Sequence, residues 1–261
     1  MNTISSDPSL ARRQTPDVLA GAGDAPWKPL YRVGAVAALV VAALTVAGVV
    51  TYVVWPPPQG TVAEWFALFQ RSPLEGMLGL DLPVLLSFLA NIPVVLALGL
   101  ALRRSGPALI TLAGALAAVA ISTHLSSSRL FEMLALSGQY ARATTDAGRA
   151  TLEAAGQSML TTYLGASAGP NPLPGWHYQG TAFNLSFVLW AVAAVLISAL
   201  MRRDGSFGRV AGPLGMVGHA LALGLFLPGV GVWLSLLSLP LLLVWYLLIA
   251  RGLLRRGRGT A

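Results

Sequence analysis

The chain of 261 residues contains no cysteine and few charged side chains. The absence of cysteine excludes disulfides, thiolate nucleophiles and cysteine-ligated metal centres. Charged residues make up only 10% of the sequence, against about 25% in a soluble domain, so they are too few to cover a water-soluble globule. Hydrophobic residues, in contrast, make up 55%. The composition therefore indicates a membrane protein.

Long apolar runs account for most of the chain. A helix that crosses the hydrocarbon layer needs about 20 apolar residues. Runs of this kind lie at about 33–55, 83–102, 107–123, 181–201, 210–227 and 230–250. They predict an all-α integral membrane bundle of six transmembrane helices, which forms one membrane domain over residues 31–255. We expect residues 1–30, which are polar and lack periodicity, to form a mobile cytoplasmic tail, and residues 256–261 to form a short basic one.

Two shorter segments between the runs are predicted to be amphipathic helices. The first, over about 61–71, begins with Thr61 and Glu64, which form a Thr-x-x-Glu capping box. In the second, over about 145–164, apolar residues recur at helical spacing. Both segments belong to connections on the same side of the membrane, so we expect them to form a short extracytoplasmic cap.

The basic side chains predict the orientation in the membrane. They gather in the two tails and in the second and fourth connections, as Arg12, Arg13, Lys28, Arg32, Arg103, Arg104, Arg202, Arg203, Arg209, Arg251, Arg255, Arg256 and Arg258. The positive-inside rule then places both termini in the cytoplasm. We expect these arginines to contact anionic lipid rather than nucleic acid. The single lysine against sixteen arginines favours a bacterial source and hence a bacterial inner membrane.

The second half of the chain resembles a known family. The stretch "GTAFNLSFVLWAVAAVLISALMRRDGSFGRVAGPLGMVGHALAL", followed by "LSLLSLPLLLVWYLLIARGLLR", resembles a bacterial six-span family catalogued as domain of unknown function 4386. The preceding "LSGQYARATTDAGRATLEAAGQSM" is similar to the alanine-rich extracytoplasmic helix of that family. The resemblance covers about residues 30–255. It implies a fold of six helices and no established activity, and it supplies no catalytic motif.

No catalytic residue, metal or cofactor is predicted. The "GASAG" of residues 165–169 fits the Gly-x-Ser-x-Gly pattern, but it follows a helix and enters a loop, whereas a hydrolase nucleophile needs a strand-to-helix turn. His124 and His177 lack chelate spacing to each other or to an acidic residue.

His219 is the strongly titratable group in the centre of an expected span, and such residues are functional candidates by default. If the helices on either side of the "PGVG" turn are followed for equal lengths, His219 lies opposite about Ser238. Pro240 has no N–H, so the carbonyl of Leu236 lacks its usual backbone hydrogen-bond donor. We therefore expect a neutral His219 to bond Ser238 and that carbonyl, a contact worth about 1 kcal/mol. A ligand-binding or proton-binding role is the alternative.

Further polar residues extend this candidate site. Asn91 in the second span, with Asn184 and Ser186 in the fourth, would form a small polar cavity if they converged on His219. Near the outer surface we expect His124 to be a hydrated interfacial histidine. Trp176, His177 and Tyr178 are predicted to anchor the chain in the headgroup layer or to line the rim of an outward-facing mouth.

These features favour a non-enzymatic membrane protein: an accessory subunit, a sensor, or a binder of a small amphiphile. Its partners would be the lipid bilayer and either another membrane protein or that amphiphile. The alternative is a transporter of small molecules or lipids, although the spans carry no carboxylates of the kind that ion-coupled transport employs. A transporter should contain a cavity that reaches the membrane midplane, whereas an accessory protein should have a filled core. An intramembrane enzyme that uses His219 is the third hypothesis.

Overall fold

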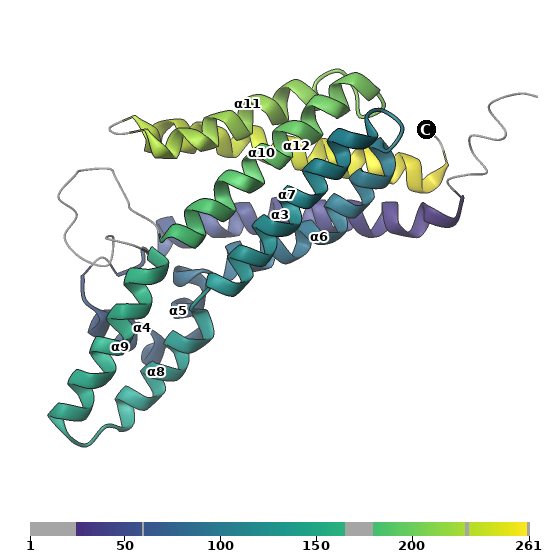
Figure 1. The fold of residues 1–261 in the computed structure, drawn as a ribbon. Helices are drawn as coiled ribbons and strands as arrows, with labels where there is room; N and C mark the ends of the chain where they lie inside the picture. The colour runs from purple at the N-terminus through teal and green to yellow at the C-terminus, as the bar shows by residue number, and fades with distance from the viewer. Residues whose placement is uncertain (1–24, 59, 165–179, 228–229, 260–261) are drawn as a thin grey trace, which may run out of the picture.

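The computed structural model describes residues 25–58, 60–164, 180–227 and 230–259, and this part of the chain is helical without strands (Figure 1). Five stretches are long and apolar enough to cross a membrane: Lys28–Val54, Leu82–Leu102, Pro107–Arg142, Thr181–Asp204 and Trp233–Arg258. A further apolar helix, Ala211–Phe226, is shorter. The composition and these helices make the chain a helical protein of the multi-pass membrane type.

Helices occupy all six of the expected apolar runs. They are α3 (Lys28–Val54), α6 (Leu82–Leu102), α7 (Pro107–Ser127), α10 (Thr181–Asp204), α11 (Ala211–Leu223) and α12 (Gly231–Arg258). Helix α11 is the short one, because its last turn tightens into the 3-10 helix η3 (Gly224–Phe226). Proline in the first turn of α3, α6 and α7 helps to set where these helices begin.

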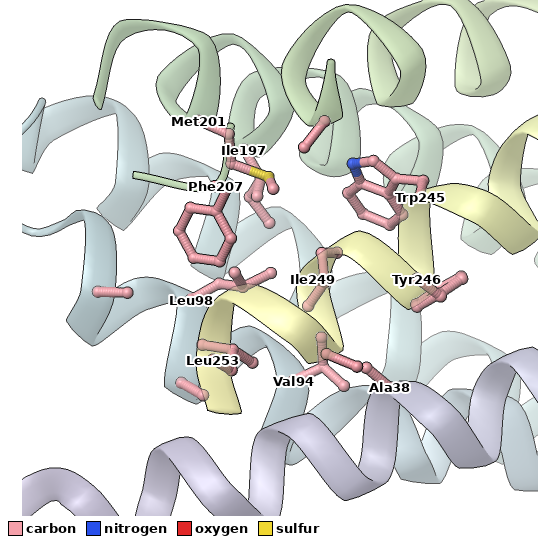
Figure 2. Close-up of a cluster of buried hydrophobic side chains, with 14 of the residues drawn as sticks. Ala38, Val94, Leu98, Ile197, Met201, Phe207, Trp245, Tyr246, Ile249 and Leu253 are labelled. Carbon is pink, nitrogen blue, oxygen red and sulfur yellow. The ribbon is translucent and has the colours of Figure 1, made fainter. Parts of the chain in front are cut away.

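These six helices form a closed ring. Each packs against the next in the order α3, α6, α7, α10, α11, α12, and α12 packs back against α3. The end of the ring nearer the C-terminus is filled by side chains. Figure 2 shows Trp245, Ile249 and Leu253 of α12 meeting Leu98 of α6 and Met201 of α10, and all five are buried.

Four shorter helices pack together at the other end of the molecule (Figure 1). They are α4 (Val62–Arg71), α5 (Pro73–Leu80), α8 (Leu130–Arg142) and α9 (Asp146–Leu164), and we call them the end unit. Its core contains Phe66, Phe69, Leu130, Met133 and Leu160. The sequence predicted α4 and α9 but not α5 and α8, whose apolar residues adjoin longer apolar runs.

Side-chain caps begin the two predicted helices of the end unit. The hydroxyl of Thr61 accepts a hydrogen bond from the Glu64 N–H at 3.4 Å. The hydroxyl of Thr145 accepts one from the Gly148 N–H at 3.1 Å. The predicted cap of α4 at Thr61 is therefore confirmed, and Thr145 caps α9 in the same way.

Helices extend into parts of both segments that were expected to be tails. Residues 1–24 lie outside the described chain, but α3 already begins at Lys28. At the other end α12 continues to Arg258, because Arg256 binds a partner on the ring: its guanidinium donates to the carboxylate of Asp204 at 3.1 Å and to the hydroxyl of Ser206 at 2.6 Å. The expected basic tail at 256–261 therefore begins as ordered helix.

Candidate functional site

A cavity of about 330 Å³ lies inside the ring, and all six ring helices contribute to its wall. Most of the lining is apolar, and it includes Val41 of α3, Phe187 of α10 and Leu242 of α12. The polar residues of the wall come from several helices: Thr45, Ser87, Asn91, His124, Ser186, His219 and Tyr246. Asn91 lies midway along α6 (Leu82–Leu102), so the cavity reaches the middle of the bundle.

Three residues of the predicted intramembrane polar site line this cavity, and so does His124, which was predicted near the outer surface. The three are Asn91, Ser186 and His219, and they come from α6, α10 and α11. Asn184 is half-buried and Ser238 is buried, and neither belongs to the cavity wall as the structure describes it. The sequence thus identified part of the lining.

The expected pair of His219 and Ser238 is wrong. The imidazole Nδ1 of His219 lies 2.8 Å from the Gly215 carbonyl on its own helix. The hydroxyl of Ser238 donates to the Ser235 carbonyl at 2.6 Å, also on its own helix. Since a carbonyl oxygen only accepts, Nδ1 carries a proton, and Nε2 is an acceptor when the ring is neutral. This Nε2 is buried, and no partner for it exists among the described residues.

The register between α11 and α12 explains the error. A Cβ at Gly218 would meet Leu241 and Leu242, so α12 is displaced along α11 relative to the register that equal lengths from the turn predict. His219 consequently packs against Trp245, with ring centroids 4.8 Å apart and the rings almost perpendicular at 79°. The neighbour of His219 on α12 is therefore an indole rather than a serine.

The hydroxyl groups in the cavity wall donate their hydrogens to the protein. Thr45 donates to the Val41 carbonyl at 2.9 Å, and Ser87 donates to the Pro83 carbonyl at 2.8 Å. Ser186 donates to the Phe183 carbonyl at 2.7 Å. A molecule in the cavity therefore meets apolar side chains and hydroxyl oxygens that accept hydrogen bonds.

His124 is the main correction to the predicted site. It was expected to be hydrated at the membrane surface, but its side chain is fully buried. Its Nε2 lies 3.4 Å from Oδ1 of Asp81, whose side chain is only 1% exposed. The hydroxyl of Ser128 donates to Oδ2 of the same carboxylate at 2.6 Å. Asp81 and His124 therefore form a buried acid–imidazole pair where the end unit meets the ring.

Sequence reasoning missed Asp81. It ends α5 and begins α6, within the apolar stretch "MLGLDLPVLL". A single acid inside such a stretch was the available signal, because a charge surrounded by apolar residues needs a partner from elsewhere in the fold. That partner is His124 of α7, which is distant in the sequence, so the sequence alone does not reveal the pair.

Aromatic rings enclose His124. The Phe88 ring stacks on the imidazole at a centroid distance of 4.1 Å and an angle of 11°. Phe183 and Tyr163 present edges to it at 5.8 and 6.4 Å. Burial, together with the nearby carboxylate of Asp81, raises the pKa of the Tyr163 hydroxyl, so this group stays neutral.

This arrangement offers binding rather than an evident reaction. Among the described residues no group of three or more His, Asp or Glu side chains could hold a metal ion. The ring of His219 contacts the Gly215 carbonyl and the Trp245 indole, and the buried hydroxyl of Ser198 lies beside Gly215. Ser167 of the "GASAG" motif and the predicted rim residues Trp176, His177 and Tyr178 lie outside the described residues.

Comparisons of the chain with protein-family models, curated proteins and solved structures find no match. The functional assignment therefore depends on the geometry of the cavity and of the Asp81–His124 pair.

Proposed function

We propose that the chain is a six-span protein of a bacterial inner membrane, with both termini in the cytoplasm. Helix α11 with η3 supplies the fifth span, because it closes the ring between α10 and α12. The end unit lies outside, because the arginines of the connections Arg103–Arg104 and Arg202–Arg203 belong on the cytoplasmic side. A ring of six helices also fits the six-span family that the sequence resembles, and we propose membership in it.

We further propose that the protein binds a small amphiphile in the ring cavity and is not an enzyme. The cavity is the observation that carries this function. Its volume of about 330 Å³ lies within the range of about 300–1,000 Å³ that is typical of ligand pockets. An apolar wall with a few fixed polar groups is also typical of such pockets. An accessory protein with a filled core would not contain this space.

The test compares two glycine variants. Gly48 lines the cavity, and a Cβ there would have only Pro83 nearby, at 3.7 Å, so Gly48→Leu should fill the space without disturbing the helix. Gly138 is an exposed residue of α8 outside this cavity, with nothing within 4 Å of its Cβ position, so Gly138→Leu is the control. Native mass spectrometry from a mild detergent should show a small molecule retained by the wild type and by Gly138→Leu but lost from Gly48→Leu. Equal retention in both variants would contradict binding in the cavity.

A small-molecule transporter is the second candidate. Two observations favour it: the cavity reaches Asn91 in the middle of α6, and the buried carboxylate of Asp81 contacts a histidine of the cavity wall. Transport would need a second arrangement in which the core around Leu98, Met201 and Trp245 opens toward the C-terminal end. Uptake of the retained ligand into proteoliposomes, with protein-free liposomes as the control, separates a transporter from a binding protein.

A further inference from the structure

We propose that the cavity selects lipophilic cations, which are small apolar molecules carrying one ammonium-type charge, and that such a cation exchanges with a proton on the Asp81–His124 pair. This inference rests on the proposed function, because it names the ligand class of the same cavity. It is carried by three features of the described residues: an incompletely paired buried carboxylate, the absence of any other positive charge in the wall, and a wall rich in aromatic rings.

The carboxylate of Asp81 needs a positive charge. Its side chain is 1% exposed, and Ser128 donates a hydrogen bond only to Oδ2. The hydroxyl of Tyr163 is a further neutral partner of this carboxylate. Oδ1 has no hydrogen bond of good geometry among the described residues, and the ionisable nitrogen beside it is His124 Nε2 at 3.4 Å. A buried carboxylate without a counter-charge is strongly destabilised. A protonated, neutral carboxyl would avoid this cost; an ionised one requires either a proton on the imidazole of His124 or a cation from outside.

The other charged groups near the pair do not supply this charge. On α8, Arg129 pairs with Glu132 at 3.4 Å, so their charges cancel. On α9, Tyr163 is neutral. On α11, His219 uses Nδ1 to bind the Gly215 carbonyl. The cavity wall described here contains no Lys, Arg, Asp or Glu from α3, α6, α7, α10 or α12. His124 is therefore the group beside Asp81 whose protonation would supply a positive charge.

The wall also suits a cation. His124 lines the cavity and contacts Asp81, so the negative charge lies directly behind the wall. Phe88, Phe183, Phe187, Trp190 and Tyr246 contribute rings to the same wall. The faces of such rings attract ammonium groups, while the hydroxyl oxygens of the wall accept hydrogen bonds. An anion would meet repulsion from Asp81 and no compensating charge.

The exchange balances in charge. When the cation enters, the imidazolium of His124 gives one proton to water and becomes neutral. The carboxylate of Asp81 stays ionised throughout. One positive charge enters the site and one leaves it, so cation and proton compete for the same buried negative charge.

The experiment uses the full chain in phosphatidylcholine nanodiscs and two probes of the same shape. The probes are benzyltrimethylammonium and its neutral isostere neopentylbenzene, in which carbon replaces the charged nitrogen. Titration calorimetry between pH 5 and pH 8, with empty nanodiscs subtracted, should show cation affinity rising up to about tenfold for each unit by which the pH is raised, because the cation competes with the proton of His124. The neutral isostere should bind independently of pH. A pH indicator should record up to one proton released per cation bound.

Asp81→Asn removes the charge, and it should abolish cation binding and proton release while the isostere still binds. Glu75→Gln is the matched control, because Glu75 is a partly exposed acid of α5 whose partner is Arg71, and it should behave as wild type. If Asp81→Asn fails to fold, His124→Gln removes the proton instead, and cation binding should then lose its pH dependence.

The outcomes separate the two proposals. Binding of the isostere without preference for the cation, or cation binding that Asp81→Asn leaves unchanged, would overturn cation selection but keep a ligand-binding cavity. Failure of both probes to bind the wild type would overturn both proposals.

Discussion

The hydroxyl of Tyr246 donates a hydrogen bond of 3.1 Å to Oδ1 of Asn91, and this bond joins α12 to α6 beside the cavity. The amide nitrogen of Asn91 in turn donates to the Ser87 carbonyl at 2.9 Å on its own helix. Both side chains are buried. The amide is thereby held by two neighbours, and the bond fixes one wall of the cavity across the ring.

Loss of this bond should destabilise the ring. Tyr246→Phe removes the hydroxyl and leaves Oδ1 of Asn91 without its donor, so we expect the free energy of unfolding to fall by about 0.5–2 kcal/mol. Unfolding by SDS in mixed micelles measures this change. Tyr52→Phe is the control, because Tyr52 is 58% exposed and its hydroxyl should contribute little. An equal effect of both substitutions would argue against the bond to Asn91.

Two glycines should respond to alanine in opposite directions. At Gly215 a Cβ would collide with Ser198 Oγ and with Trp245, since α11 approaches α10 and α12 closely there. Gly215→Ala should therefore cost about 1–3 kcal/mol through overpacking. At Gly114 of α7 nothing lies within 4 Å of the Cβ position, so Gly114→Ala should gain up to about 1 kcal/mol of helix stability. The same unfolding assay compares them, and a stabilised Gly215→Ala would contradict the close approach.

The orientation can be tested because the native chain has no cysteine. Thr144→Cys places a thiol at an exposed position between α8 and α9, and Arg258→Cys places one at the exposed end of α12. In intact cells a membrane-impermeant maleimide should label Thr144→Cys, whereas Arg258→Cys should react only after lysis. The reverse pattern would invert the proposed topology, and labelling of both before lysis would place α12 and the end unit on one side.

Apolar run length predicted the positions of the long helices, because an intramembrane backbone must satisfy its own hydrogen bonds and therefore forms helices wherever the chain is apolar enough. The sequence predicted less well which polar side chains contact one another. Asn91, Ser186 and His219 could be identified as intramembrane polar groups, and they meet at one cavity. Asp81 and His124 could not be paired, because their contact depends on how α5, α6 and α7 meet.

Contacts between distant connections were likewise hidden in the sequence. Asp204 accepts hydrogen bonds from Ser105 at 2.5 Å and from Arg256 at 3.1 Å, across three different parts of the chain. From the sequence, the arginines at the end of α12 are predicted to be determinants of topology that contact anionic lipid, not partners of Asp204. The number of basic residues in a connection predicts on which side of the membrane that connection lies. The partner of each arginine, in contrast, depends on which helices become neighbours in the ring.

His219 provides the sharpest test of the register between α11 and α12. The structure predicts energetic coupling of His219 to Trp245, whose rings meet edge to face at 4.8 Å. It predicts no energetic coupling of His219 to Ser238, because the hydroxyl of Ser238 donates its hydrogen bond to the Ser235 carbonyl. In a double-mutant cycle, His219→Ala and Trp245→Phe should therefore deviate from additivity by more than about 0.5 kcal/mol.

His219→Ala and Ser238→Ala, by the same reasoning, should be additive within about 0.3–0.5 kcal/mol. Each cycle is measured as the free energy of unfolding in the same mixed micelles. Coupling to Ser238 with additivity at Trp245 would show that the two helices are shifted toward the register of a simple hairpin. The imidazole would then bridge α11 and α12 rather than pack on the indole, and the wall of the cavity at His219 would have to be rebuilt.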